Sequence, residues 1–159
     1  MALLDNAVLA WGLAACGLAQ LSKLIVELVK YRRWRPAVLF ETGGMPSSHS
    51  ALVSGTAAGL GWQLGFSHPD FALATTVAFV VMYDASGIRR AAGYTAARVN
   101  LLSSEVSITS AEVNLKENLG HSRLEVVVGS LIGPTVALPG IAFLGSPLDI
   151  AQLLGLPLG

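Results

Sequence analysis

The sequence predicts an all-α integral membrane protein, a helical bundle of about four transmembrane helices that forms a single domain over residues 1–159. Apolar residues make up 53% of the chain and charged residues 13%, whereas ordinary soluble domains carry roughly 25% charged residues. Four apolar stretches approach the roughly 20 residues that a membrane helix needs. The ten Lys and Arg balance the ten Asp and Glu, so bulk charge gives no reason to expect nucleic-acid binding.

The first expected span covers about residues 6–29 and meets its first basic residue at Lys23. Its Leu13-Ala14-Ala15-Cys16 segment resembles the site at which bacterial lipoprotein signal peptides are cleaved. A signal peptide begins with a positively charged region, and no Lys or Arg precedes Lys23. A retained membrane helix is therefore the preferred interpretation, and lipoprotein processing is the alternative.

The second and third expected spans cover about residues 49–66 and 71–87. The second has no Asp, Glu, Lys or Arg, and it contains small residues that allow membrane helices to pack closely, namely Gly55, Ala58, Gly59 and Gly61. The third meets its first charge at Asp84. We expect Asp84 to form an ion pair with a following Arg, and His68 in the short connecting loop to be a turn residue.

The fourth expected span covers about residues 124–144. Pro134 and Pro139 lie inside it, and proline removes a helical hydrogen bond, so we expect a kink or a break into shorter pieces. Before this span, residues 89–122 are polar with a rough helical spacing of apolar residues. They predict either an interfacial helix or a partly mobile loop.

The basic residues fall in only two regions of this map. All ten lie near the end of the first span or in the loops 30–48 and 88–123, whereas the loop 67–70 and both ends of the chain have none. The positive-inside rule therefore places both basic loops in the cytoplasm and both termini outside. The membrane would be a bacterial inner membrane, or a thylakoid or plastid membrane in a photosynthetic organism.

Two short motifs on this basic side could support chemistry. Gly43-Gly44-Met45-Pro46-Ser47-Ser48-His49-Ser50 precedes the second span, and its Ser47 and Ser48 would lie at a helix N-terminus, which favours anions. Gly120-His121-Ser122-Arg123-Leu124-Glu125 begins the fourth span. If His121 and Glu125 are both helical, they share one face, and the carboxylate would orient the imidazole.

These motifs resemble those of the type 2 phosphatidic acid phosphatase superfamily, which includes the vanadium-dependent haloperoxidases. Pro46-Ser47-Ser48-His49 is similar to its Pro-Ser-Gly-His motif, and His121-x3-Glu125 is similar to its His-x3-Asp motif. Together with Asp84-Ala85-Ser86-Gly87-Ile88-Arg89-Arg90, they resemble the divergent branch of that superfamily.

The resemblance implies a phosphatase without metal or other cofactor. His121 would be the nucleophile that forms a phosphohistidine, His49 would protonate the leaving oxygen, and Glu125 would hold His121. The substrate would be an amphiphile with a phosphate monoester among the membrane lipids, such as phosphatidylglycerol phosphate, phosphatidic acid or a prenyl phosphate.

The phosphate-binding cations depart from the superfamily pattern. Arg35-Pro36 is present, but Leu28 and Leu115 occupy the positions where the superfamily has its Lys and its second Arg. Substitutes are available nearby. The candidates for binding phosphate are Lys23, Arg33, Arg35, Ser47, Ser48, Arg89, Arg90 and Lys116, with Asp84, Gly44 and Gly120 in structural roles.

Two other functions remain open at this point. The altered motifs would also fit a catalytically idle relative that acts as a small structural or assembly subunit, packed through its second span against a second copy or another membrane protein. Vanadate-dependent halide oxidation is the other alternative, and the four apolar spans and small size argue against it.

Overall fold

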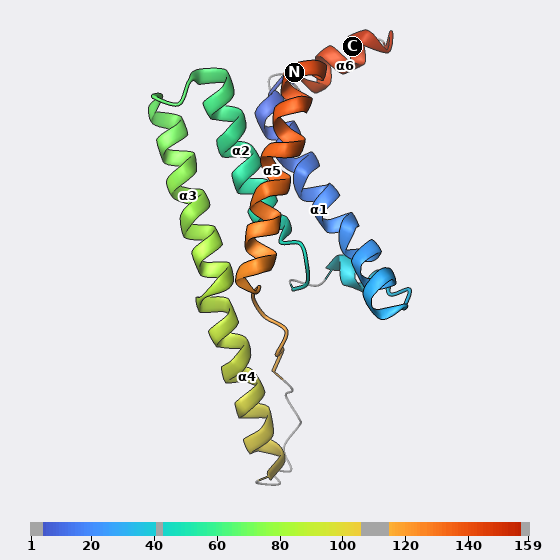
Figure 1. Cartoon of the computed structure of the whole chain (residues 1–159), viewed down its shortest axis with the longest axis vertical. Coiled ribbons are helices and arrows are strands. Elements are labelled where there is room, and N and C mark those ends of the chain that lie inside the picture. Colours follow the sequence, from blue (N-terminus) through green and yellow to red (C-terminus); the bar gives the residue numbers. More distant parts are fainter. Residues whose placement is uncertain (1–4, 41–42, 106–114, 157–159) are drawn as a thin grey trace.

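The computed structural model describes residues 5–40, 43–105 and 115–156, and in this part of the chain the regular structure is entirely helical. Four helices form a bundle, a fifth extends one of them beyond the bundle, and a short sixth follows the last (Figure 1). Their bounds are α1 Ala7–Tyr31, the 3₁₀ helix η1 Pro36–Phe40, α2 Ser48–Leu64, α3 Pro69–Ser86, α4 Ile88–Glu105, α5 Arg123–Leu144 and α6 Pro147–Leu153. The predicted all-α bundle is confirmed.

Small residues hold the bundle together, and α2 is its central helix, packed against α1, α3 and α5. A Cβ atom on Gly55 would lie 3.1 Å from the carbonyl oxygen of Gly133 in α5, and one on Gly59 would lie 2.8 Å from Ile141. A Cβ atom on Gly12 of α1 would lie 2.6 Å from the Thr56 hydroxyl. The glycines of α2 therefore serve contacts within the chain, because they let the backbones approach closely.

The predicted spans agree with the helices to within two residues at each end. Among the described residues, three helical stretches are long and apolar enough to cross a membrane, Ala7–Tyr31, Pro69–Ser103 and Arg123–Leu144. The second predicted span, α2, has 17 residues, at the lower end of the range of about 17 to 25 that spans a bilayer. Of the kink or break expected in the fourth span, the break is absent, because α5 continues through Pro134 and Pro139.

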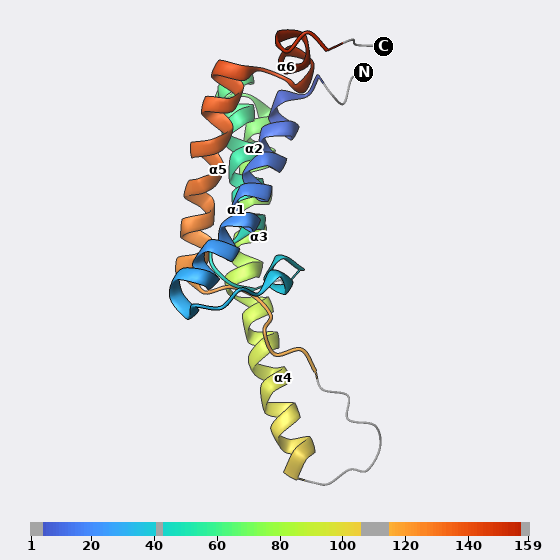
Figure 2. The same ribbon diagram turned by 90° about the vertical axis from the view of Figure 1, so that its right-hand side faces the viewer.

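The polar stretch after the third span forms α4. It continues almost in line with α3 and projects away from the bundle, and residues 115–122 lie beside the α3–α4 rod (Figures 1 and 2). The helix therefore extends the rod of α3 and does not lie across the end of the bundle, as an interfacial helix would. Residues 106–114 of the stretch lie outside the described residues, and residues 115–122 are not helical.

The two ends of the bundle differ in composition. The start of α1 and the end of α5 meet at one end, where the Trp11 indole N–H donates to the Gly145 carbonyl over 2.8 Å. At the other end lie the starts of α2 and α5 and the loops that join α1 to α2 and α4 to α5. All ten Lys and Arg belong to this second half of the bundle, its loops and α4.

Candidate active site

The segment that carries His121 lies directly before α5. The His121 backbone N–H donates to the Ala85 carbonyl at the end of α3 over 2.8 Å. Gly120 has φ +77°, and a Cβ atom there would collide with the backbone of Arg89 and Arg90. Glycine is required at this position on both counts.

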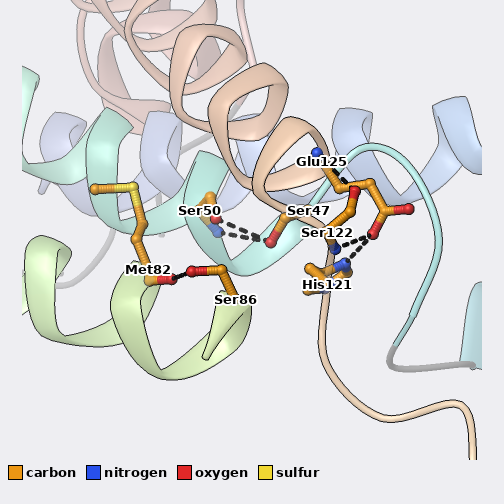
Figure 3. A network of polar contacts seen from close by, with 7 residues as sticks. All are labelled: Ser47, Ser50, Met82, Ser86, His121, Ser122 and Glu125. Atoms are coloured by element: carbon orange, nitrogen blue, oxygen red, sulfur yellow. Dashed lines mark hydrogen bonds and ion pairs between the residues drawn. The ribbon is translucent and has the colours of Figure 1, made fainter. Parts of the chain in front are cut away.

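A capping box, which the sequence analysis overlooked, brings Glu125 to His121. The helix begins at Arg123, so His121 is not part of α5 and the expected shared helix face is wrong. Ser122 is the N-cap, and its backbone N–H donates to Glu125 Oε2 over 3.0 Å. The carboxylate therefore points back along the chain, and the same Oε2 lies 3.2 Å from His121 Nδ1 (Figure 3).

This contact defines the chemistry of the imidazole. A carboxylate only accepts hydrogen bonds, so Nδ1 carries the proton and Nε2 of the neutral ring carries the free lone pair. His121 is 3% exposed, and Nε2 is buried without a hydrogen-bond partner among the described residues. A buried polar atom of this kind is uncommon and calls for an explanation, of which a catalytic role is one.

The start of α2 is bound to the start of α5. The Ser47 backbone N–H donates to the Glu125 carbonyl over 3.1 Å. Gly129 of α5 packs directly on the Ser47 carbonyl oxygen. The Ser47 hydroxyl accepts hydrogen bonds from the Ser50 backbone and hydroxyl, so it caps α2 (Figure 3). Ser47 and Ser48 are both buried.

A pocket of about 190 Å³ joins the two histidines. His49, on the first turn of α2, and His121 both line it, together with Asp84, Arg89 and apolar residues of α3. Asp84 Oδ2 lies 2.6 Å from Arg89 Nε. Asp84 thus forms the structural ion pair that the sequence predicted.

A larger pocket of about 570 Å³ lies on the side of His121 that faces α1, and Lys23 is its most deeply buried cation at 3% exposed. A buried Lys is rare unless its charge is compensated, so its position beside the histidines is informative. Four other predicted site residues line this pocket with Lys23 and His121: Gly44, Arg90, Gly120 and Glu125.

Three of the predicted cations lie elsewhere. Arg33 and Arg35 line a neighbouring pocket with Glu27 and Tyr31, two residues that also line the larger pocket, and Arg35 Nη1 lies 4.0 Å from Glu27 Oε1. Lys116 is exposed and lines none of these pockets. The structure therefore brings Lys23, Arg89 and Arg90 to the histidines.

Burial lowers the pKa of His121 below its ordinary value. The positive charges of Lys23 and His49 add to this effect, whereas the hydrogen bond and negative charge of Glu125 oppose it. The ring is thus kept neutral in water near pH 7, and a nucleophilic histidine must be neutral. Among the described residues, no three His, Cys, Asp or Glu side chains gather as metal ligands.

Fold and site together define a membrane helical bundle with a buried histidine, a second histidine and several cations at one end. The sequence profile of the Divergent PAP2 family matches residues 4–136, and the chain belongs to this family. It is also 35% identical over 146 residues to the "Uncharacterized membrane protein YuiD" of Bacillus subtilis, covering 84% of this chain and 92% of that protein. No solved structure matches the chain. The resemblance drawn from the three motifs is thereby confirmed, and the protein is a membrane protein.

Proposed function

We propose that this protein is a membrane phosphatase that hydrolyses a phosphate monoester on a lipid or isoprenoid through a phosphohistidine on His121. One observation carries the proposal. His121 Nδ1 is bound by Glu125, which leaves the lone pair on a buried Nε2 that no described residue contacts by hydrogen bond. This is the arrangement that a histidine nucleophile requires.

The reaction would proceed in two steps. His121 Nε2 attacks phosphorus, the new N–P bond forms as the P–O bond to the alcohol breaks, and protonated His49 gives its proton to the leaving oxygen. Water then attacks the phosphohistidine and transfers a proton to His49, which releases inorganic phosphate and restores His121. The pocket shared by both histidines supports this division of roles.

The charge of the transition state would be stabilised by cations and helix termini. Uncatalysed hydrolysis of phosphate monoesters is so slow that accelerations reach about 10²¹, of which one general acid supplies about 10² to 10⁴. Lys23, Arg89 and Arg90 line the pockets around His121, and the starts of α2 and α5 lie beside it. Positioned charges of this kind are usually the largest single contribution to catalysis.

The position of the site suits an amphiphile. It lies at one end of the apolar bundle, so a lipid could keep its chains in the bilayer while its phosphate reaches the cations. Phosphatidylglycerol phosphate, phosphatidic acid and prenyl phosphates share this geometry. The basic residues favour the cytoplasmic face for this end, with both chain termini outside. Tags at each terminus that antibodies reach in intact cells would support this orientation, and tags reached only after permeabilisation would contradict it.

Trapping of the covalent intermediate tests the function directly. The purified chain is mixed briefly with ³²P-labelled lipid phosphates of each class and quenched in alkali, which preserves phosphohistidine. We expect label on the peptide that contains His121 and phosphate release with the same substrate. His121→Ala should abolish both, and His68→Ala, at the opposite end of the bundle, should abolish neither. Absence of release from every substrate would contradict the proposal and favour a non-enzymatic subunit.

A further inference from the structure

The chain segment before His121 lies along one face of the α3–α4 rod. Its contacts run from Asn100, through Gly93 and the Arg89–Arg90 backbone, to Ala85. These positions are separated by roughly one or two helical turns, so they form one stripe on the helix surface. Figure 2 shows the segment returning beside α4.

Asn100 makes the far attachment of this segment. Its Oδ1 accepts from the Leu115 N–H over 3.0 Å, and its Nδ2 donates to the Leu115 carbonyl over 2.9 Å and to Glu117 Oε1 over 2.8 Å. The carboxamide thus uses its acceptor and both of its donors. No other residue type offers both functions at this length of side chain.

The attached segment is also a wall of the larger pocket. Residues 117–122 line that pocket opposite Lys23 and the end of α1. Gly93 permits this wall to lie close to α4, because a Cβ atom there would be 2.5 Å from the Glu117 carbonyl oxygen. The wall includes His121, whose backbone N–H donates to the Ala85 carbonyl, so the position of the wall along the α3–α4 rod contributes to where the imidazole lies.

We propose that Asn100 is a positioning residue that clamps the wall 117–122 onto α4 and thereby holds His121 buried beside the cations. This inference rests on the proposed function for its effect on turnover, but not for its effect on the accessibility of His121. Loss of the clamp frees the far end of the wall and leaves the bundle intact, because α4 projects beyond the bundle.

Chemical modification tests the clamp without any need for activity. The purified full-length chain is treated with diethyl pyrocarbonate, and mass spectrometry follows carbethoxylation of His121 relative to His68 in the same sample. We expect Asn100→Ala to raise the relative rate at His121 several-fold, because local opening exposes it. Thr95→Ala is the matched control, since the Thr95 hydroxyl donates to the Ala91 carbonyl within α4 and makes no other hydrogen bond to the described residues. An unchanged rate in Asn100→Ala would overturn the proposal.

Two conservative variants distinguish the loss of the Asn100 hydrogen bonds from a general disruption of α4. Glu117→Gln keeps the oxygen that accepts from Asn100, so its rate should match the wild-type rate. Asn100→Asp keeps the acceptor but loses both donors and faces Glu117, so it should behave like Asn100→Ala. Wild-type behaviour of Asn100→Asp would overturn the proposal.

Turnover supplies the second readout. A displaced nucleophile lowers kcat, and we expect Asn100→Ala to lose about 10- to 100-fold. Exposure of His121 also removes the main influence that lowers its pKa, so the acidic limb of the pH–rate profile should move to higher pH. Loss of folded protein alone would lower kcat without moving that limb, and this result would overturn the proposal. A wild-type chain without phosphatase activity would instead refute the proposed function and leave the modification test in place.

Discussion

His68 and His121 lie at opposite ends of the bundle and illustrate how much the surroundings of a histidine matter. Each precedes a helix, and each has its Nδ1 near a carboxylate, 3.6 Å from Asp70 and 3.2 Å from Glu125. The His68 side chain is 42% exposed and that of His121 is 3% exposed. A histidine–carboxylate pair is therefore not in itself a site.

The difference lies in what else each end of the bundle supplies. His68 Nδ1 accepts from the Asp70 backbone N–H and caps α3, and its loop carries no Lys or Arg. His121 lies beside Lys23 and His49, and its Nε2 is left for chemistry. Burial, cations and an unused nitrogen together distinguish the candidate active site from a helix cap.

Removal of each imidazole gives the largest expected contrast. Loss of a nucleophile costs about 10⁶ in turnover in a well-studied hydrolase, so His121→Ala should reduce phosphate release to background. His68→Ala removes a helix cap and should cost about 1 kcal/mol of stability, but it should leave the turnover of the folded protein within about twofold, because His68 lies at the end of the bundle opposite the site. Release of inorganic phosphate from a lipid phosphate measures both. Equal losses in the two variants would show that the comparison between the two ends is wrong.

The buried cation gives the next largest effect. Lys23 lines the pocket beside His121, and removal of one group that stabilises transition-state charge costs about 10² to 10³ in kcat. We therefore expect a loss of that size for Lys23→Met. Lys116→Met is the control, since Lys116 is exposed and lines none of the pockets described. A larger loss for Lys116→Met than for Lys23→Met would reverse our assignment of the phosphate-binding lysine.

The sequence was sufficient to predict α1, α2, α3 and α5, because each is a long apolar run of the kind that forms a membrane helix. It also predicted that His121 meets Glu125, but the reason was wrong. The four-residue spacing to Glu125 suggested a helix face, whereas the contact comes from the Ser122–Glu125 capping box. A Ser followed three residues later by Glu, before an apolar run, is a visible signal of that box.

Other parts of the site depend on contacts that no local pattern encodes. Arg35-Pro36 matched the family motif, yet the chain turns at Arg32, which has φ 52°, and Arg35 lies near Glu27 in a neighbouring pocket that His121 does not line. Gly129 belongs to no motif either, although its lack of a side chain lets α5 pack closely on Ser47. Such residues become recognisable only when distant segments are placed side by side.

Two glycines of α5, one near each end of the bundle, allow a comparison of how tightly the two ends are packed. A Cβ atom on Gly129 would collide with the Ser47 carbonyl oxygen, and one on Gly140 would collide with the Trp11 ring. Each substitution by Ala should destabilise the protein by about 1 to 3 kcal/mol through overpacking, measured as a lower Tm in detergent. Gly129→Ala should also lower kcat about tenfold, because it displaces the start of α2 from Glu125. Equal turnover in both variants would contradict a link between this packing and the site.

The smallest expected effect is a shift in pH dependence. Glu125 raises the pKa of His121 against the opposing effect of burial, so Glu125→Gln should lower that pKa further. The nucleophile would then become neutral at lower pH, and the acidic limb of kcat/KM, which reports the free enzyme, should move to lower pH. Gln keeps an oxygen that can accept from Nδ1 and from the Ser122 N–H, so the ring should stay oriented. Glu117→Gln is the matched control, since Glu117 lines the same pocket without contacting His121. An acidic limb that stays in place or moves to higher pH would mean that Glu125 acts on the site through the capping box alone. Glu125 would then serve only to cap a helix, as His68 does at the start of α3.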